Sequence, residues 1–472
     1  MIDLGNLTIE KAHASFKKGE FTCRELAEAY LKVIKEKNPE IHAYLEIYSD
    51  VLVQADEAQK KFKKGNATLM TGIPLAIKDN LLFEGHIASS GSKILEKYVA
   101  TYNATAIKKL KDAGVVIIGR TNMDEFAMGV STENSAYGVT KNPYDTTRVP
   151  GGSSGGSTTA VASNMALVAL GTDTGGSCRQ PASFCGVVGL KPTYGSVSRH
   201  GLTAMGSSLD VIGAIGKNIS DVQTVFDFIK GKDNMDSTSI SSDFYKKNII
   251  QKPVIGIPRD FTKEGDDRVL ANFKEVIKKI KALGYTVKDI ELPNVKYTVP
   301  AYYIVTPAEI SANLARFDGM RYGFSPESRN LVEVYTKSRG EGFGREVRRR
   351  ILLGTYVLSH GYQDAYYNKA NAVRRLIVDD YNKAFKKVDL ILTPTTTGPA
   401  FKIGEKVNDP VKMYLEDIFT GPANMTGLPA ISIPSGFVEE EGKHLPLGIQ
   451  FIASHGREDL LFAVGKKFEA QN

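Results

Sequence analysis

The sequence has few of the features on which several large classes of protein depend. It contains three cysteines, Cys23, Cys178 and Cys185, which are too few and too irregularly spaced for a disulfide framework or a CxxC zinc site. No window approaches about 18 uninterrupted apolar residues, so we expect no transmembrane helix and no membrane contact. The N-terminal residues lack a signal-peptide pattern. Together these absences favour a cytoplasmic protein, with an organelle as the alternative.

Nucleic-acid motifs are also missing, because we find no zinc finger, RNP-like aromatic motif or arginine-rich arm. The formal net charge of +7 is mild and permits an anionic partner without requiring one. With 472 residues, of which 42% are hydrophobic and 24% are charged, the composition is that of a large globular protein. No break in composition forces a division, so we predict one domain over residues 1–472. Its core spans about 20–468, with the N-terminal helices of residues 1–65 packed on it.

Two clusters rich in glycine and serine are the most informative feature of the chain. They cover Gly151–Ser157 and Gly171–Pro181, and the apolar stretch Thr158–Leu170 separates them. Glycine is used where the backbone must approach a reacting atom closely. A flexible Gly/Ser linker is the alternative, but an apolar run would not follow one, and a linker would not carry Asp173 and Arg179. We therefore expect the two clusters to line two sides of one site, with one short apolar element between them in the sequence.

The residues from 151 to 181 resemble the amidase signature of serine amidohydrolases, which use a Ser-cisSer-Lys triad. The resemblance implies that Ser177, which follows Gly175-Gly176 in the second cluster, is the nucleophile. It likewise implies Ser153 as the bridging serine and Lys78 as the base. The family fold is a single α/β domain with a large mixed twisted β-sheet flanked by helices on both faces.

The chemistry of these three side chains agrees with those roles. A serine needs a base to take its proton, and none of the seven histidines lies in either cluster, so a Ser-His-Asp site is unsupported. A lysine base must be neutral, and complete burial can lower its pKa by roughly 3–5 units. Lys78 follows an apolar, strand-like run. The Ser153 hydroxyl both donates and accepts, so it can relay a proton between Lys78 and Ser177.

The second cluster also supplies donors for the negative oxygen that forms during amide hydrolysis. We expect Arg179 to brace this loop with Asp173 as its partner, the alternative being a surface ion pair. Ser154 and Ser157 are interpreted as hydrogen-bonding residues of the loops, and Cys178 as a packing residue. The predicted oxyanion hole consists of the backbone N–H groups of Thr174, Gly175, Gly176 and Ser177.

Helical and strand-like patterns alternate along the chain, which predicts an α/β sheet. The expected helices are Thr8–Lys18, Thr22–Glu36, Asp50–Lys64, Ala104–Ala113 and Val269–Leu283. The expected strands are Ile73–Ile77, Val115–Gly119, Val254–Ile257, Leu390–Leu392, Ala430–Ile433 and Leu447–Phe451.

Within the amidase signature family, the chain from about residue 7 to 468 is most similar to the glutaminase subunits of tRNA-dependent amidotransferases. The segments that carry this similarity are Arg120–Gly129, Ser131–Ser135, Ser311–Gly319 and Arg349–Tyr356. The similarity implies that Arg350 and Asp417 hold the two charged ends of glutamine, together with Tyr302 or Tyr303. It adds Met128 and Gly129 to the substrate site. The alternative for Arg350 and Asp417 is an ordinary surface charge.

Two positions and one segment depart from the family pattern near this pocket, namely Cys178, Val130 and Gly421–Asn424. They put the fit of the substrate in question, but not the hydrolytic chemistry.

The resemblance also implies partners. Ammonia would pass to the B subunit, which uses ATP and Mg²⁺ to amidate Glu-tRNA(Gln) or Asp-tRNA(Asn), and the C subunit would complete a heterotrimer. The misacylated tRNA would bind mainly through the partner protein. We expect no cofactor and no metal in this chain, which shows neither a P-loop nor an acidic cluster. The alternatives are a stand-alone amidase for small amides and a scaffold protein without catalytic activity.

Overall fold

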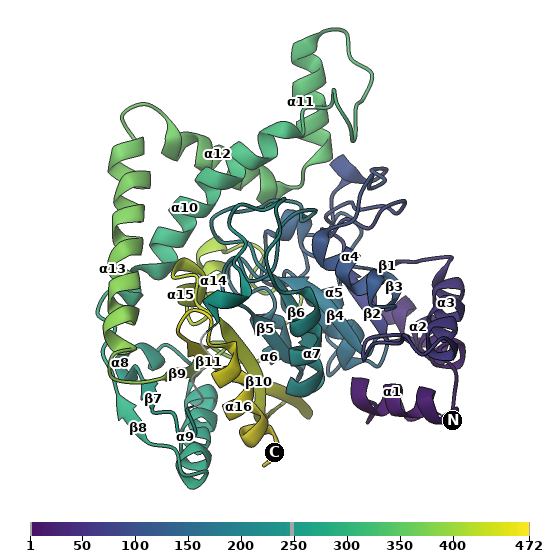
Figure 1. Cartoon of the computed structure of the whole chain (residues 1–472). Coiled ribbons are helices and arrows are strands. Elements are labelled where there is room, and N and C mark those ends of the chain that lie inside the picture. Colours follow the sequence, from purple (N-terminus) through teal and green to yellow (C-terminus); the bar gives the residue numbers. More distant parts are fainter. Residues whose placement is uncertain (1, 246–249, 472) are drawn as a thin grey trace.

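A computed structural model describes residues 2–245 and 250–471. Within these residues eleven strands form one mixed sheet (Figure 1). The strands are β1 Tyr44–Ile47, β2 Pro74–Lys78, β3 Val116–Thr121, β4 Val168–Thr172, β5 Val188–Lys191, β6 Ile212–Gly216, β7 Ile255–Ile257, β8 Val287–Asp289, β9 Leu390–Pro394, β10 Ala430–Glu440 and β11 Lys443–Ala453. Their order across the sheet is β1-β3-β2-β4-β6-β5-β10-β11-β9-β7-β8.

Helices flank this sheet, so the predicted α/β fold with a large mixed sheet is confirmed. They are α1 Ile9–Lys18, α2 Cys23–Ile41, α3 Val51–Lys63, α4 Thr105–Asp112, α5 Gly155–Ala162, α6 Arg179–Phe184, α7 Ile219–Ile229, α8 Arg259–Thr262, α9 Asp267–Ala282, α10 Thr298–Asn313, α11 Leu331–Gly342, α12 Arg345–Leu358, α13 Lys369–Ala384, α14 Pro410–Leu415, α15 Gly421–Met425 and α16 Glu458–Glu469. Short 3-10 or π segments are η1 Lys93–Leu95, η2 Glu125–Ala127, η3 Ser242–Phe244, η4 Val295–Tyr297, η5 Leu314–Arg316 and η6 Gln363–Asn368.

The register of two neighbouring strands places Lys78 beside the start of the second glycine-serine cluster. Strand β2 pairs in parallel with β4, with Leu75 opposite Val168. The carboxyl ends of both strands therefore lie at the same edge of the sheet, where open α/β sheets bind ligands. Lys78 is the last residue of β2, and β4 ends at Thr172, immediately before the Asp173–Ser177 loop.

The apolar stretch between the clusters differs from the prediction. We expected one short element over Thr158–Leu170, but the structure has the helix α5 followed by the strand β4. The turn between them includes Asn164 in the left-handed region, at φ 61°. Helix α5 is buried on all sides from Gly155 to Val161. A helix buried all round has no amphipathic period, so its sequence pattern cannot be distinguished from that of a buried strand.

The boundaries of other elements also exceed the predicted ranges. Helix α2 continues beyond Glu36 through Pro39 and ends at Ile41, and the following residue, His42, has φ 58°. Strands β10 and β11 form a hairpin that extends beyond the apolar segments to the pair Glu440 and Lys443. The tip of the hairpin, from residue 439 to 444, consists of polar residues and a glycine and is largely exposed, so the hydrophobic pattern did not reach it.

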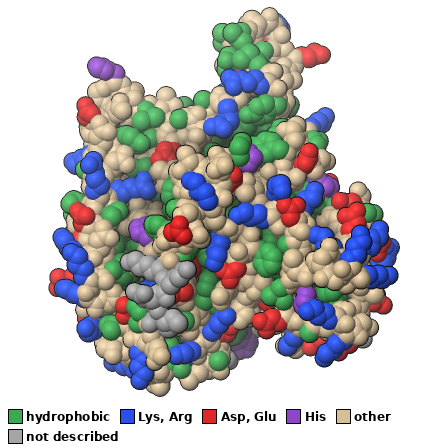
Figure 2. Space-filling model, in the orientation of Figure 1, with side chains coloured by type: hydrophobic (Ala, Val, Ile, Leu, Met, Phe, Trp, Pro, Cys, Tyr) green, Lys and Arg blue, Asp and Glu red, His purple; other side chains and the backbone are tan. Residues whose placement is uncertain are grey.

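Helix α11 projects from the top of the molecule in Figure 1. It exposes Leu331 and Val332, and hydrophobic side chains gather on this projection in Figure 2. No helix among the described residues is long and apolar enough to cross a membrane.

Candidate active site

Lys78 lies fully buried at the end of β2 and is surrounded by hydroxyl groups. Its Nζ is 2.7 Å from Ser153 Oγ, 2.9 Å from Ser154 Oγ and 2.8 Å from Thr172 Oγ1. Burial lowers the pKa of the Lys78 ammonium from its usual value to about 8, although nearby acidic groups act in the opposite direction. An amine with this pKa is partly neutral near physiological pH and can accept a proton.

Ser153 is held in a tightly packed turn of the first cluster. The peptide bond between Gly152 and Ser153 is cis. The Gly152 N–H donates to Gln180 Oε1 at 2.9 Å. A Cβ at Gly152 would lie 2.2 Å from Asp124 Oδ2, so only glycine fits there. The preceding Gly151 has φ 85°, which also favours glycine.

Ser177 stands on the second cluster, next to Gly176 at φ 147°. A Cβ at Gly176 would lie 2.3 Å from Thr420 Oγ1. The Ser177 carbonyl accepts a hydrogen bond from the Ser154 N–H at 3.2 Å, which joins the two clusters directly. Within residues 2–245 and 250–471, the backbone N–H groups of residues 174–177 have no acceptor. They are therefore available to receive a negatively charged oxygen.

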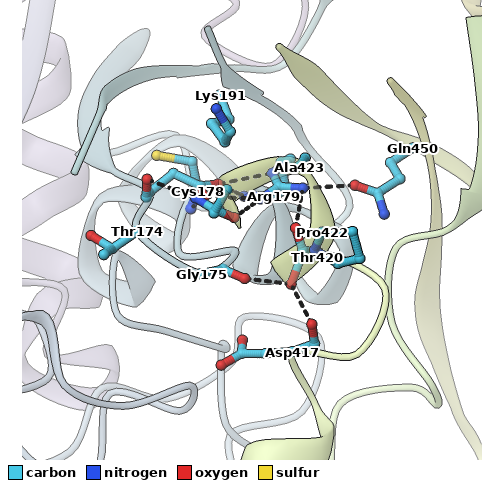
Figure 3. A network of polar contacts seen from close by, with 12 residues as sticks. Thr174, Gly175, Cys178, Arg179, Lys191, Asp417, Thr420, Pro422, Ala423 and Gln450 are labelled. Atoms are coloured by element: carbon cyan, nitrogen blue, oxygen red, sulfur yellow. Dashed lines mark hydrogen bonds and ion pairs between the residues drawn. The ribbon is translucent and has the colours of Figure 1, made fainter. Parts of the chain in front are cut away.

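Asp173 and Arg179 brace the second cluster from inside the protein, and Figure 3 shows Arg179 within this network. Both side chains are fully buried and lie 2.9 Å apart, so the pair is not on the surface. Burial opposes ionisation of Asp173, but Arg179 lowers the pKa of this carboxyl to about 2. Arg179 also donates to Asn424 Oδ1 at 2.6 Å and Gln450 Oε1 at 2.8 Å. Asn424 in turn donates to Asp173 at 2.9 Å, which explains why a polar residue ends the segment Gly421–Asn424.

A second group of charged and aromatic side chains forms a pocket beside the clusters. Arg350 of α12 is buried, and its Nε donates to Glu346 Oε1 at 2.8 Å. Its guanidinium lies over the rings of Tyr303 and Tyr414, at 5.2 and 5.5 Å from their centroids. The Tyr303 hydroxyl donates to Asp417 Oδ2 at 2.8 Å. Burial raises the pKa of Asp417 to about 7, while the Tyr303 hydrogen bond and Arg350 oppose this rise.

The two adjacent tyrosines of α10 have different positions. Tyr303 contacts Asp417, whereas Tyr302 packs against the second cluster. A Cβ at Gly175 would lie 2.7 Å from the Tyr302 hydroxyl oxygen. Tyr302 therefore shapes the loop that carries Ser177, and Tyr303 faces the charged pocket.

Met128 and Gly129 belong to a buried segment that reaches the same pocket. Gly129 and Val130 line it together with Arg350. The Met128 carbonyl accepts from Asn134 Nδ2 at 3.2 Å, which holds this segment in place.

Sequence reasoning did not include Glu346, Tyr414 and Thr172 in the site. Glu346 stands four residues before Arg350, the spacing at which helix side chains pair, so this partner was detectable. Nothing in the local sequence indicates Tyr414. It lies in α14, which is distant from α12 in the sequence and comes close to it only in the folded protein.

Two further groups bear on the chemistry of the site. Cys178 is buried and its pKa is raised by burial to about 12, so its thiol stays protonated near neutral pH. Among the described residues no group of three or more His, Cys, Asp or Glu side chains is placed to hold a metal ion.

Comparisons with known proteins show which family the chain belongs to. The Amidase family matches residues 25–462, and the chain therefore belongs to that family. It is 50% identical to the A subunit of glutamyl-tRNA(Gln) amidotransferase from Thermoanaerobacter pseudethanolicus, over 100% of this chain and 97% of the relative. The protein of the same name from Microcystis aeruginosa is 48% identical over 98% of this chain and 97% of the relative.

Solved structures give the same result. The crystal structure of the A subunit of glutamyl-tRNA(Gln) amidotransferase from Thermotoga maritima matches with a TM-score of 0.78 and 41% identity, covering 99% of this chain and 94% of that one. The peptide amidase from Stenotrophomonas maltophilia matches with a TM-score of 0.82 and 27% identity, covering 99% of this chain and 97% of that one.

Proposed function

We propose that this chain is the glutaminase component of a glutamyl-tRNA(Gln) amidotransferase. The full-length similarity to proteins of that name supports the assignment. The observation that carries it is the contact of Arg350 and Asp417 with one tyrosine, because the Arg350 guanidinium lies over the Tyr303 ring and the Tyr303 hydroxyl donates to Asp417, which brings a cation and a carboxylate together. Glutamine has a carboxylate and an ammonium at one end, and an arginine fork and an aspartate suit these groups. A pocket for simple amides would need neither charge.

The proposed reaction uses three residues, and the 2.7 Å contact between Lys78 Nζ and Ser153 Oγ supports the first part of the proton relay. Ser153 passes the proton of Ser177 to neutral Lys78, and Ser177 Oγ attacks the carbon of the side-chain amide. The N–H groups of residues 174–177 stabilise the oxygen as it becomes negative. Ammonia then leaves with a proton returned from Lys78 through Ser153. Water hydrolyses the resulting ester by the same relay and releases glutamate.

The other components lie outside this chain. The B and C subunits complete the proposed heterotrimer, and the B subunit uses ATP and Mg²⁺ to activate the carboxylate of Glu-tRNA(Gln) or Asp-tRNA(Asn). The misacylated tRNA binds mainly to that partner. We propose a cytoplasmic location, where the three free and buried cysteines stay reduced.

The test is to co-express the chain with the B and C subunits and to measure glutamate release from glutamine, with and without Glu-tRNA(Gln) and ATP. We expect glutaminase activity and transfer of ammonia to the tRNA-linked glutamate. Hydrolysis of small amides at a rate unaffected by the partners, with no activity on glutamine, would support the stand-alone amidase instead.

A further inference from the structure

Thr420 connects the charged pocket to the loop that carries Ser177. It is fully buried at the start of α15, three residues after Asp417. Its hydroxyl donates to the carbonyl oxygen of Gly175 at 2.7 Å, as the dashed line in Figure 3 shows. Within the described residues this carbonyl has no other donor. One side chain therefore fixes the orientation of the peptide between Gly175 and Gly176.

Thr420 is itself held firmly. Its backbone carbonyl accepts from Arg179 Nη1 at 3.0 Å, and the carbonyl of Phe419 accepts from Gln450 Nε2 at 2.6 Å. Because Arg179 is anchored by Asp173, the position of the Thr420 hydroxyl depends on the same buried network that braces the second cluster. This network explains how one hydroxyl can restrain a glycine-rich loop.

The geometry of a peptide bond gives this contact a chemical consequence. In a trans peptide the C=O and N–H groups lie in one plane and point in opposite directions. With its oxygen bound by Thr420, the Gly175 carbonyl directs the Gly176 N–H to the other side of the loop. That N–H has no acceptor within the described residues. Two consecutive glycines rotate easily, so without the threonine this peptide could turn and aim its oxygen at the site.

We propose that Thr420 is a positioning residue, whose hydroxyl orients the Gly175–Gly176 peptide so that the Gly176 N–H meets the oxyanion. The proposal rests on the proposed function for the identity of the substrate, but the same orientation serves any amide attacked by Ser177. It predicts an effect on the transition state rather than on the binding of glutamine, because glutamine in its ground state carries no oxyanion.

Three variants of the full chain, each assembled with the B and C subunits, separate this role from simple packing. Thr420→Val removes the hydroxyl at nearly constant shape, and Thr420→Ser keeps the hydroxyl but loses the methyl group. Thr426→Val is the matched control, because the Thr426 hydroxyl is buried nearby and donates to the Pro422 carbonyl inside α15 at 2.7 Å.

We expect Thr420→Val to lower kcat for glutamine by about 10- to 100-fold, since loss of one oxyanion donor costs about 10²–10³ and here the donor is misdirected rather than removed. KM should change by less than about twofold. Thr420→Ser and Thr426→Val should keep kcat within about threefold of the wild type.

A binding measurement gives a second readout. A boronic acid analogue of glutamine, with B(OH)₂ in place of the side-chain amide, forms a bond from Ser177 Oγ to boron and becomes a negative tetrahedral centre, while the hydroxyl proton of Ser177 passes through Ser153 to the neutral Lys78 amine. Its affinity should fall in Thr420→Val by the same factor as kcat/KM, while the affinity for glutamate stays within about twofold.

A normal kcat in Thr420→Val would overturn the proposal. So would an equally impaired Thr420→Ser, or a parallel loss of affinity for glutamate and the boronic acid, because each would indicate packing. If the wild type hydrolyses a simple aliphatic amide but not glutamine, the proposed function is wrong, and the same comparison with that amide still tests Thr420. A wild type that hydrolyses neither overturns both.

Discussion

The amine of Lys78 lies 2.7 Å from the hydroxyl of Ser153, and both side chains are completely buried. An ammonium group has three donors and no acceptor, so a charged Lys78 can only donate to this hydroxyl. Transfer of a proton from Ser153 to Lys78 therefore needs the neutral amine. The protonation of one buried lysine thus sets the pH at which the proposed relay can work.

The first prediction concerns this pH dependence. Burial lowers the pKa of Lys78 to about 8, and the active form is the deprotonated one. We therefore expect kcat/KM for glutamine to rise about tenfold per pH unit below pH 8 and to level off above it. Lys78→Arg keeps the charge but cannot deprotonate, so it should be as inactive as Lys78→Ala.

The exposed Lys60→Arg is the control and should behave like the wild type. A flat profile between about pH 6 and 9, or substantial activity in Lys78→Arg, would show that Lys78 is not the base.

The second prediction concerns the nucleophile. Ser177→Ala should lower glutamine hydrolysis by about 10⁴-fold or more, as expected when a serine nucleophile is lost. The assembled complex should still amidate Glu-tRNA(Gln) when free ammonia is supplied, because only the source of ammonia is removed. Ser183→Ala serves as the control, since this buried serine contacts Thr396 instead. Near-normal glutaminase turnover in Ser177→Ala would refute the assignment.

The sequence predicted the parts of the site that depend on local spacing. The glycines of both clusters marked the site in the sequence because a side chain at these positions would collide with neighbouring atoms. At Gly152, for example, a Cβ would collide with the Asp124 carboxylate. The apolar run before Lys78 predicted a buried strand, and β2 ends at this lysine. The alternation of helical and strand-like patterns predicted an α/β fold, because hydrophobic periodicity depends only on neighbouring residues in the sequence.

What the sequence left open depends on contacts between distant segments. The sequence could not decide whether Tyr302 or Tyr303 belongs to the glutamine site. Only the packing of α10 shows that Tyr303 contacts Asp417. It also gave no reason for Asn424, whose partners Asp173 and Arg179 stand about 250 residues earlier. Such pairings arise from the order of strands in the sheet, which local patterns do not specify.

The third prediction concerns recognition of glutamine. Loss of one partner from a buried charge pair typically costs about 2–5 kcal/mol. At about 1.4 kcal/mol per factor of ten, Arg350→Ala and Asp417→Ala should each raise KM for glutamine by roughly 30-fold or more. Hydrolysis of a simple aliphatic amide, which carries neither charged group, should barely change. Steady-state kinetics with both substrates provide the measurement.

Arg348→Ala is the matched control, because Arg348 is an exposed residue of the same helix. Equal damage to both substrates would mean that Arg350 and Asp417 support the fold rather than recognise the amino acid. Wild-type KM values in both variants would favour the stand-alone amidase.

The fourth prediction concerns the buried pair that braces the second cluster. Arg179→Met leaves Asp173 buried without its cation, which should lower the free energy of unfolding by about 3–5 kcal/mol. Arg259→Met removes a partner of Asp289 from a pair whose side chains are 45% and 67% exposed, so it should cost at most about 1 kcal/mol. Urea denaturation followed by circular dichroism measures both. If the two variants lose equal stability, the Arg179 network does not anchor the loop in the way its geometry indicates, because Arg179→Met leaves Asp173 buried without its cation and also removes the buried donor to Asn424, Gln450 and the Thr420 carbonyl.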